Sequence, residues 1–163
     1  MGEYSFPTEG LDASGLRVAI VVSRFNEDIT GALLDGARRA LAEHGLPDDA
    51  LTLVSVPGAY ELPLTAKQLA AHGAADAVIC LGAVVRGDTP HFEYVAGEAA
   101  RGIMQASLDT GVPIIFGVLT VDTHQQALDR VGGSEGHKGE EAAITAIEMA
   151  NLVGRLSGGS HRA

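Results

Sequence analysis

The sequence predicts a three-layer α/β/α domain, in which a four-stranded parallel sheet is covered by helices on both faces. Four short apolar runs rich in β-branched residues alternate with longer stretches in which apolar residues recur every three or four positions. This alternation is typical of βαβ units in a parallel sheet. The length of 163 residues, 46% of them hydrophobic and 20% charged, suits one domain with a single substantial core.

The first half of the chain contains two predicted strand–helix units. Residues 16–23, LRVAIVVS, form an almost unbroken β-branched run, which is typical of a strand buried on both faces. Apolar residues at helical spacing predict a helix over 27–44. The run LTLVSVP predicts a second strand over 51–57, and a second helix is expected over 61–72.

The second half repeats the pattern and adds a last helix. Strands are predicted over 76–84 and 112–119, followed by helices over 90–110 and 123–131. The last helix is expected over 138–156, where small apolar residues keep helical spacing. A small parallel sheet with helices on both faces is best matched by a flavodoxin-like fold.

The domain organisation follows from these elements. Residues 16–157 are predicted to form one domain, after an extended N-terminal arm at 1–15 and before a flexible C-terminal tail at 158–163. The arm is either a disordered tail or a segment that lies on a neighbouring molecule. The helix predicted over 90–110 is rich in small residues, which suits close packing against another molecule.

Composition excludes several classes of function. With 21 acidic and 11 basic residues, the formal net charge is −10, so no basic face is available to a nucleic acid. The single cysteine, Cys80, lies in an apolar run and is expected to be a buried hydrophobe. No apolar run has the length of a membrane span, and no histidine pattern predicts a metal site. A cytoplasmic protein without membrane contact is expected.

Ligands of open parallel sheets bind beyond the carboxyl ends of the strands. The residues that follow each apolar run are therefore the candidate site, and each of these segments contains a glycine, an aromatic residue or a polar cluster. The segments are 23–27, 57–63, 82–91 and 116–123.

The segment GAVVRGDTPH at 82–91 resembles a phosphate loop without its cation. Its two glycines keep P-loop spacing, but Asp88 stands where the lysine is required. Thr89 and Pro90 predict a helix start whose free N–H groups can bind an anion through the backbone alone. Asp88 is equally well explained as a turn residue. His91 falls in the first helical turn, where the dipole favours the neutral imidazole, which can transfer protons.

Five motifs occur in the order and at the intervals of one family. They are RFNE, PGAYELP, LGAVVRGDTPHFEYV, FGVLTVDT followed by QALDR, and HKGEEAA followed by AIEMANL. Across residues 16–156 the chain resembles 6,7-dimethyl-8-ribityllumazine synthase, an enzyme of riboflavin biosynthesis. The resemblance implies condensation of 5-amino-6-(D-ribitylamino)uracil with 3,4-dihydroxy-2-butanone 4-phosphate, without metal or organic cofactor.

The resemblance also assigns roles to individual residues. His91 matches the proton-transfer histidine. The uracil substrate is assigned to Phe25, Ala59, Tyr60, Glu61, Ala83, Val84, Val85 and Phe116. The phosphate is assigned to Asp88, Thr89 and Arg130. Asn26 and Lys138 are further candidates, the lysine near the phosphate. Phe116 and Arg130 are expected to come from the adjacent subunit.

Assembly is also implied by the resemblance. Family members form pentamers or larger pentamer-based particles, and the compact link GGSEGHKG at 132–139 resembles that of icosahedral shells of twelve pentamers. Riboflavin synthase is the suggested partner enzyme. Two alternatives remain open, a non-catalytic module that binds flavin or lumazine and a structural shell protein. A flavodoxin-like electron carrier is less favoured, because the segment after the first strand lacks a Ser/Thr- and Gly-rich phosphate cradle.

Overall fold

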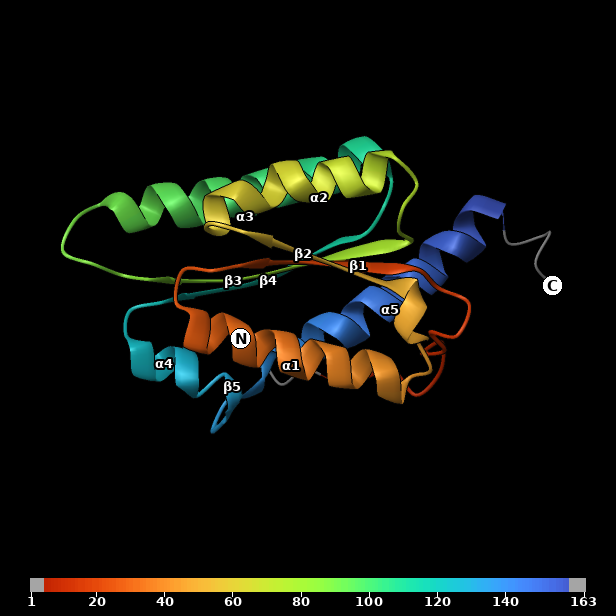
Figure 1. Cartoon of the computed structure of the whole chain (residues 1–163), viewed down its shortest axis with the longest axis horizontal. Coiled ribbons are helices and arrows are strands. Elements are labelled where there is room, and N and C mark those ends of the chain that lie inside the picture. Colours follow the sequence, from red (N-terminus) through yellow and green to blue (C-terminus); the bar gives the residue numbers. More distant parts are fainter. Residues whose placement is uncertain (1–4, 159–163) are drawn as a thin grey trace.

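The central layer is a sheet of four parallel strands in the order β2-β1-β3-β4 (Figure 1). The structure is a computed structural model that describes residues 5–158. The strands are β1 (Val18–Ser23), β2 (Leu51–Val56), β3 (Ala77–Val85) and β4 (Ile114–Val121). The chain adds β2 on one side of β1, then crosses to the other side to add β3 and β4. The carboxyl ends of β1 and β3 therefore flank the point where the winding reverses.

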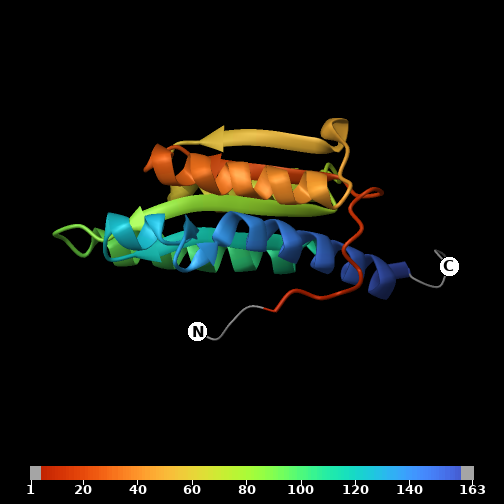
Figure 2. The ribbon, with the colours of Figure 1, turned by 90° about the horizontal axis from the view of Figure 1, so that it is seen from below.

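Helices cover both faces of this sheet. One face carries α2 (Leu62–Ala71) and α3 (His91–Thr110), which Figure 1 shows above the strands. The other face carries α1 (Glu27–Glu43) and α5 (Lys138–Gly158), which lie in front of the strands in Figure 2. The short α4 (His124–Leu128) lies on the same side as α1 (Figure 1). The predicted three-layer, flavodoxin-like arrangement is confirmed.

Alternation along the strands builds a separate core on each face. In β1, Val18 and Ile20 pack in the core shared with α1 and α5, whereas Ala19 and Val21 pack with α2 and α3. In β3, Ile79 faces the first core and Cys80 the second, and both are fully buried. Because both faces are covered, these strands read as unbroken apolar runs. Burial raises the pKa of the Cys80 thiol to about 12, so the thiol stays protonated at neutral pH.

Most element boundaries fall within two residues of their predicted positions, but residues 123–137 differ. The fourth helix was expected over 123–131, and α4 ends at Leu128. An unpredicted hairpin follows, β5 (Val131–Gly133) and β6 (Gly136–His137). Gly132 and Gly136 have φ of 108° and 78°, a left-handed region that residues with a side chain rarely adopt, so both glycines suit this hairpin and neither could continue a helix. Two short 3-10 helices, Asp48–Ala50 and Ala59–Glu61, precede β2 and α2.

The imidazole of His137 fills a gap between α1 and α5. A β-carbon at Gly36 on α1 would overlap this ring, and one at Gly139 on α5 would overlap the carbonyl of Leu33. Nδ1 of His137 also accepts hydrogen bonds from the N–H groups of Gly139 (3.2 Å) and Glu140 (3.4 Å) at the start of α5. The hairpin is thereby held at a fixed position against both helices.

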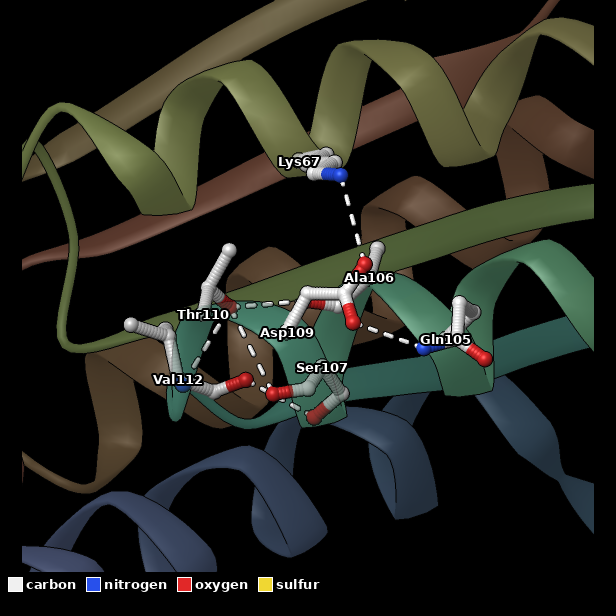
Figure 3. A network of polar contacts seen from close by, with 7 residues as sticks. All are labelled: Lys67, Gln105, Ala106, Ser107, Asp109, Thr110 and Val112. Atoms are coloured by element: carbon white, nitrogen blue, oxygen red, sulfur yellow. Dashed lines mark hydrogen bonds and ion pairs between the residues drawn. The ribbon is translucent and has the colours of Figure 1, made fainter.

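The C-terminal end of α3 is held by a polar network (Figure 3). Ser107 Oγ donates to the carbonyl of Val112 (2.8 Å) and accepts from the N–H of Ile114 (3.2 Å). The Asp109 carboxylate accepts from Gln105 (2.6 Å) and pairs with Lys67 of α2 (3.3 Å). These bonds fix the turn between α3 and β4 at the amino end of the sheet.

The part of the predicted arm that the structure describes lies partly on the domain. Ala13 is fully buried, and Asn151 of α5 donates to the carbonyls of Gly10 (2.8 Å) and Asp12 (3.0 Å). Residues 1–4 of the arm and 159–163 of the predicted tail lie outside the described range, and Gly158 belongs to α5. None of the described helices is both long enough and apolar enough to span a membrane.

Candidate active site

A hollow of about 460 Å³ opens where the winding of the sheet reverses. It lies at the carboxyl ends of β1, β2 and β3, beside the first turns of α3. This is the position at which open α/β sheets bind ligands. Its lining is mostly apolar with a few polar groups, and comprises Phe25, Asn26, Gly58, Ala59, Tyr60, Glu61, Ala83, Val84, Val85, His91, Tyr94 and Val95.

Nine of these lining residues are among those that the sequence singles out, and three are not. Gly58, Tyr94 and Val95 were missed. Tyr94 and Val95 follow His91 by three and four positions on α3, so helical spacing places all three side chains on one face. Gly58 belongs to the PGAYELP motif, and its lack of a side chain lets the Phe25 ring approach.

The segment after β1 presents Phe25 through an unusual backbone conformation. Asn26 has φ 59° and ψ 55°, and among the described residues it alone combines a side chain with a positive φ. Such a conformation costs free energy and persists where surrounding contacts hold it. Here the amide Nδ2 of Asn26 donates to the carbonyl of Ala83 (3.1 Å), which ties the β1 end to the β3 end. The Phe25 side chain remains 70% exposed, with its ring available for stacking.

The segment after β2 is tied to the segment after β1. The N–H groups of Arg24 and Phe25 donate to the carbonyl of Pro57 at 3.2 and 3.1 Å. One carboxylate oxygen of Glu61 accepts from the N–H of Gly58 (3.1 Å), and a β-carbon at Gly58 would lie only 3.1 Å from the Phe25 ring. Glu61 thus closes its own loop with one oxygen, while the other has no hydrogen-bond partner within residues 5–158.

The third wall of the hollow is the start of α3. The helix begins at His91, one residue later than predicted, and the Thr89 hydroxyl accepts from the N–H of His91 at 3.4 Å. Within residues 5–158, the imidazole of His91 and the phenol of Tyr94 have no hydrogen-bond partner. An exposed imidazole beside an aromatic hollow is suited to proton transfer with a bound ligand.

Arg86, just before this helix, contacts three groups. Its Nε donates to the Asp122 carboxylate (2.7 Å), its Nη1 donates to the Glu93 carboxylate, and its guanidinium carbon lies 4.3 Å from the centroid of the Phe92 ring. The hydrogen bonds to Asp122 and Glu93 raise the pKa of Arg86, and the Arg86 guanidinium lowers the pKa of Glu93. The loop is therefore bound to the end of β4 and to α3.

Five residues that the sequence singles out lie outside the hollow. Asp88 and Thr89 are exposed on the loop before α3. Arg130 donates to the carbonyl of Gln126 (2.9 Å), and Lys138 pairs with Glu141 (2.7 Å). Phe116 lies inside β4, within the strand predicted over 112–119, and 45% of its surface is exposed.

A second hollow, of about 480 Å³, lies at the amino ends of the strands. It is bordered by the C-terminal half of α1 and by β2, with Arg38, Arg39 and Leu53 among its lining residues. The two hollows are of similar size, so size does not decide the assignment. Of these two, the first is the one on which aromatic rings, a carboxylate and an imidazole converge. Within residues 5–158, no group of His, Cys, Asp and Glu side chains is arranged to hold a metal ion.

The chain matches a known protein family. A sequence model of the 6,7-dimethyl-8-ribityllumazine synthase family matches residues 15–154, which is most of the 163-residue chain. The matched range includes every residue that lines the first hollow. The chain therefore belongs to the 6,7-dimethyl-8-ribityllumazine synthase family.

Proposed function

We propose that the protein condenses 5-amino-6-(D-ribitylamino)uracil with 3,4-dihydroxy-2-butanone 4-phosphate to give 6,7-dimethyl-8-ribityllumazine, phosphate and water. Family membership supports this activity. The observation that carries it is the convergence of three groups on one hollow, namely the exposed ring of Phe25, the carboxylate of Glu61 and the imidazole of His91. Within residues 5–158 this imidazole has no hydrogen-bond partner. A heteroaromatic ring with a polyol chain can stack on the aromatic ring and donate hydrogen bonds to the carboxylate.

Binding of the uracil substrate is assigned to the walls of the hollow. The Phe25 ring stacks on the pyrimidine, and the free oxygen of Glu61 accepts from ribityl hydroxyls or ring N–H groups. The backbone of Ala83, Val84 and Val85 at the end of β3 faces the ring edge. The main-chain groups of Ala59 and Tyr60 hold the polyol. Asn26 acts indirectly, since its amide is already bonded to Ala83.

The proton transfers are assigned to His91. The 5-amino group attacks the ketone carbonyl and water leaves, which forms an imine. Removal of the proton from the adjacent carbon then drives the C–O bond electrons onto the leaving phosphate. After tautomerisation, the ribitylamino nitrogen closes the ring and a second water leaves. The His91 imidazole takes up and returns protons in these steps.

The phosphate is assigned to the loop before α3 and to a second subunit. The backbone N–H groups of Asp88 and Thr89, near the start of a 20-residue helix, suit an anion. Phe116, Arg130 and Lys138 lie outside the hollow of their own chain, which agrees with a site completed by a neighbour. Exposed Leu64, Met104 and Leu108 on α2 and α3 provide apolar surface for such contacts.

The assembly in this proposal is a pentamer, with twelve pentamers forming a shell. Static light scattering at neutral pH should give the mass of a shell, and a particle of pentamer mass in all buffers would remove the shell from the proposal. Co-purification with riboflavin synthase would test the partner enzyme. The single cysteine is free and buried, which agrees with a cytoplasmic location.

The activity is tested by mixing both substrates with purified protein. Lumazine absorbance should rise faster than in the spontaneous reaction, without added metal or nucleotide. If the protein binds the uracil but does not accelerate the reaction, the non-catalytic binding module is the correct function.

A further inference from the structure

The first turn of α3 divides its side chains between two environments. His91, Tyr94 and Val95 line the hollow. Phe92 and Glu93, between them in sequence, contact Arg86 instead. Successive residues of an α-helix are rotated by about 100°. A contact that holds Phe92 and Glu93 on one side therefore determines where His91 points.

The backbone and the side chain of Arg86 are themselves held by hydrogen bonds to the end of β4. Its own N–H donates to the carbonyl of Val121 (2.9 Å), which extends the β3–β4 ladder by one bond beyond the Val85–Val121 pair. Its Nε donates to Asp122, just after β4. Asp122 is held in turn, because its N–H donates to Gln126 Oε1 (2.8 Å) of α4. Figure 1 shows that the loop from β3 to α3 extends past the sheet at the end where α4 lies.

We infer that Arg86 is a positioning residue that fixes the rotation of the first turn of α3, and with it the direction of the His91 imidazole. This inference rests on the proposed function for its kinetic consequence. Neither ion pair is buried, since the side chains of Arg86, Glu93 and Asp122 are 43%, 55% and 66% exposed. Exposed pairs add little to global stability. The arrangement of Arg86 therefore orients a helix start more than it stabilises the fold.

The guanidinium group suits this role better than an ammonium group. Its planar fork donates to two carboxylates in different directions while its face stacks on Phe92. Lysine would keep the charge but bind only one carboxylate well. Arg86→Met should loosen the first turn of α3, and Arg86→Lys should loosen it less. Glu93→Gln removes the charge of one of the two carboxylate partners and should also loosen this turn in part.

The first experiment is amide hydrogen exchange by mass spectrometry on the assembled full-length protein. In Arg86→Met, residues 94–98, whose N–H groups donate the first hydrogen bonds within the helix, should exchange about tenfold faster than in the wild type, because the helix start opens locally. Residues 105–110 at the other end of α3 serve as the internal control and should not change. Arg101→Met, which removes an exposed arginine from the same helix, is the matched control variant. Unchanged exchange at 94–98 would overturn the inference.

Steady-state kinetics then test the consequence for the reaction. Arg86→Met should lower kcat about tenfold, as expected for a misdirected catalytic group, with each KM changed less than about twofold. Arg86→Lys should recover part of kcat. A higher KM at unchanged kcat would make Arg86 a substrate contact and overturn its positioning role. If the wild type itself does not accelerate the reaction, the proposed function fails, and hydrogen exchange still decides whether Arg86 fixes the helix start.

Discussion

The two ends of α3 carry similar polar side chains but use them differently. At the C-terminal end, Ser107 and Asp109 bond to neighbouring protein groups, as Figure 3 shows. At the N-terminal end, His91 and Tyr94 face a hollow and have no hydrogen-bond partner within residues 5–158. Polar groups satisfied by the protein have a structural role, whereas unpaired ones beside an apolar hollow are available to a ligand.

The largest expected effect is at the N-terminal end of the helix. His91→Ala should lower kcat about 10²-fold, because the general acid–base group is lost. Thermal unfolding should be almost unchanged, since the imidazole bonds to nothing in residues 5–158. His72→Ala, at the end of α2, is the control and should retain full activity. Equal rates in the wild type and His91→Ala would show that the open imidazole has no catalytic role.

The second-largest expected effect concerns Arg130, which lies outside the hollow. Arg130→Ala should weaken binding of the butanone phosphate by about 1.5–3 kcal/mol, as expected for the loss of a charge-assisted hydrogen bond. The dissociation constant of each substrate, from equilibrium titration, measures this loss. Arg155→Ala on α5 is the matched control. A change confined to the uracil substrate would place Arg130 outside the phosphate site.

At the C-terminal end of α3, substitution should affect stability and leave catalysis intact. Ser107→Ala leaves the carbonyl of Val112 and the N–H of Ile114 without their partner, which should cost about 1–2 kcal/mol in the free energy of unfolding. Urea unfolding at one fixed protein concentration measures this loss. Ser157→Ala removes an exposed hydroxyl bond on α5 and should cost less. A tenfold loss of kcat in Ser107→Ala would contradict the division between the two ends.

The smallest effect concerns acid stability. Two hydrogen bonds, the stronger influence from Gln105 and the weaker from Lys67, lower the pKa of Asp109 below its ordinary value of 3.8. Stability from this carboxylate is therefore fully present above pH 3.8 and is lost as the pH falls through the lowered pKa. As the pH falls below about 4, the urea concentration at which half the protein is unfolded should decrease less in Asp109→Asn than in Asp49→Asn. Parallel pH profiles for the two variants would show that the network around Asp109 does not hold its charge.

The sequence predicts the layers of the fold well, because each layer leaves a periodic trace. Strands buried on both faces give unbroken apolar runs, and helices over them give three- and four-residue spacing. The hairpin at 131–137 leaves no such trace. Its strands have three and two residues, and contacts between His137 and two helices hold it in place. Its position is set by tertiary contacts, which a periodic pattern does not report.

The hollow is similarly divided between what local sequence shows and what it does not. The segments that contain Phe25, Glu61 and His91 were found because parallel strands bring their carboxyl ends to one edge, and the family resemblance then singled out Phe25 and Glu61 within them. Arg86 was not, because its partners Glu93 and Asp122 lie 7 and 36 residues away along the chain. In a sequence, an arginine bound in this way is indistinguishable from a solvated one.

The His137 ring between α1 and α5 limits the size of the residue at position 36, which is far from it along the chain. Gly36 has no space for a methyl group while the imidazole is present, and the imidazole has space only because residue 36 is glycine. The two positions therefore behave as one unit under selection. A larger residue at 36 is acceptable only on a background in which residue 137 has become smaller, so the order in which substitutions arise at this helix pair is constrained.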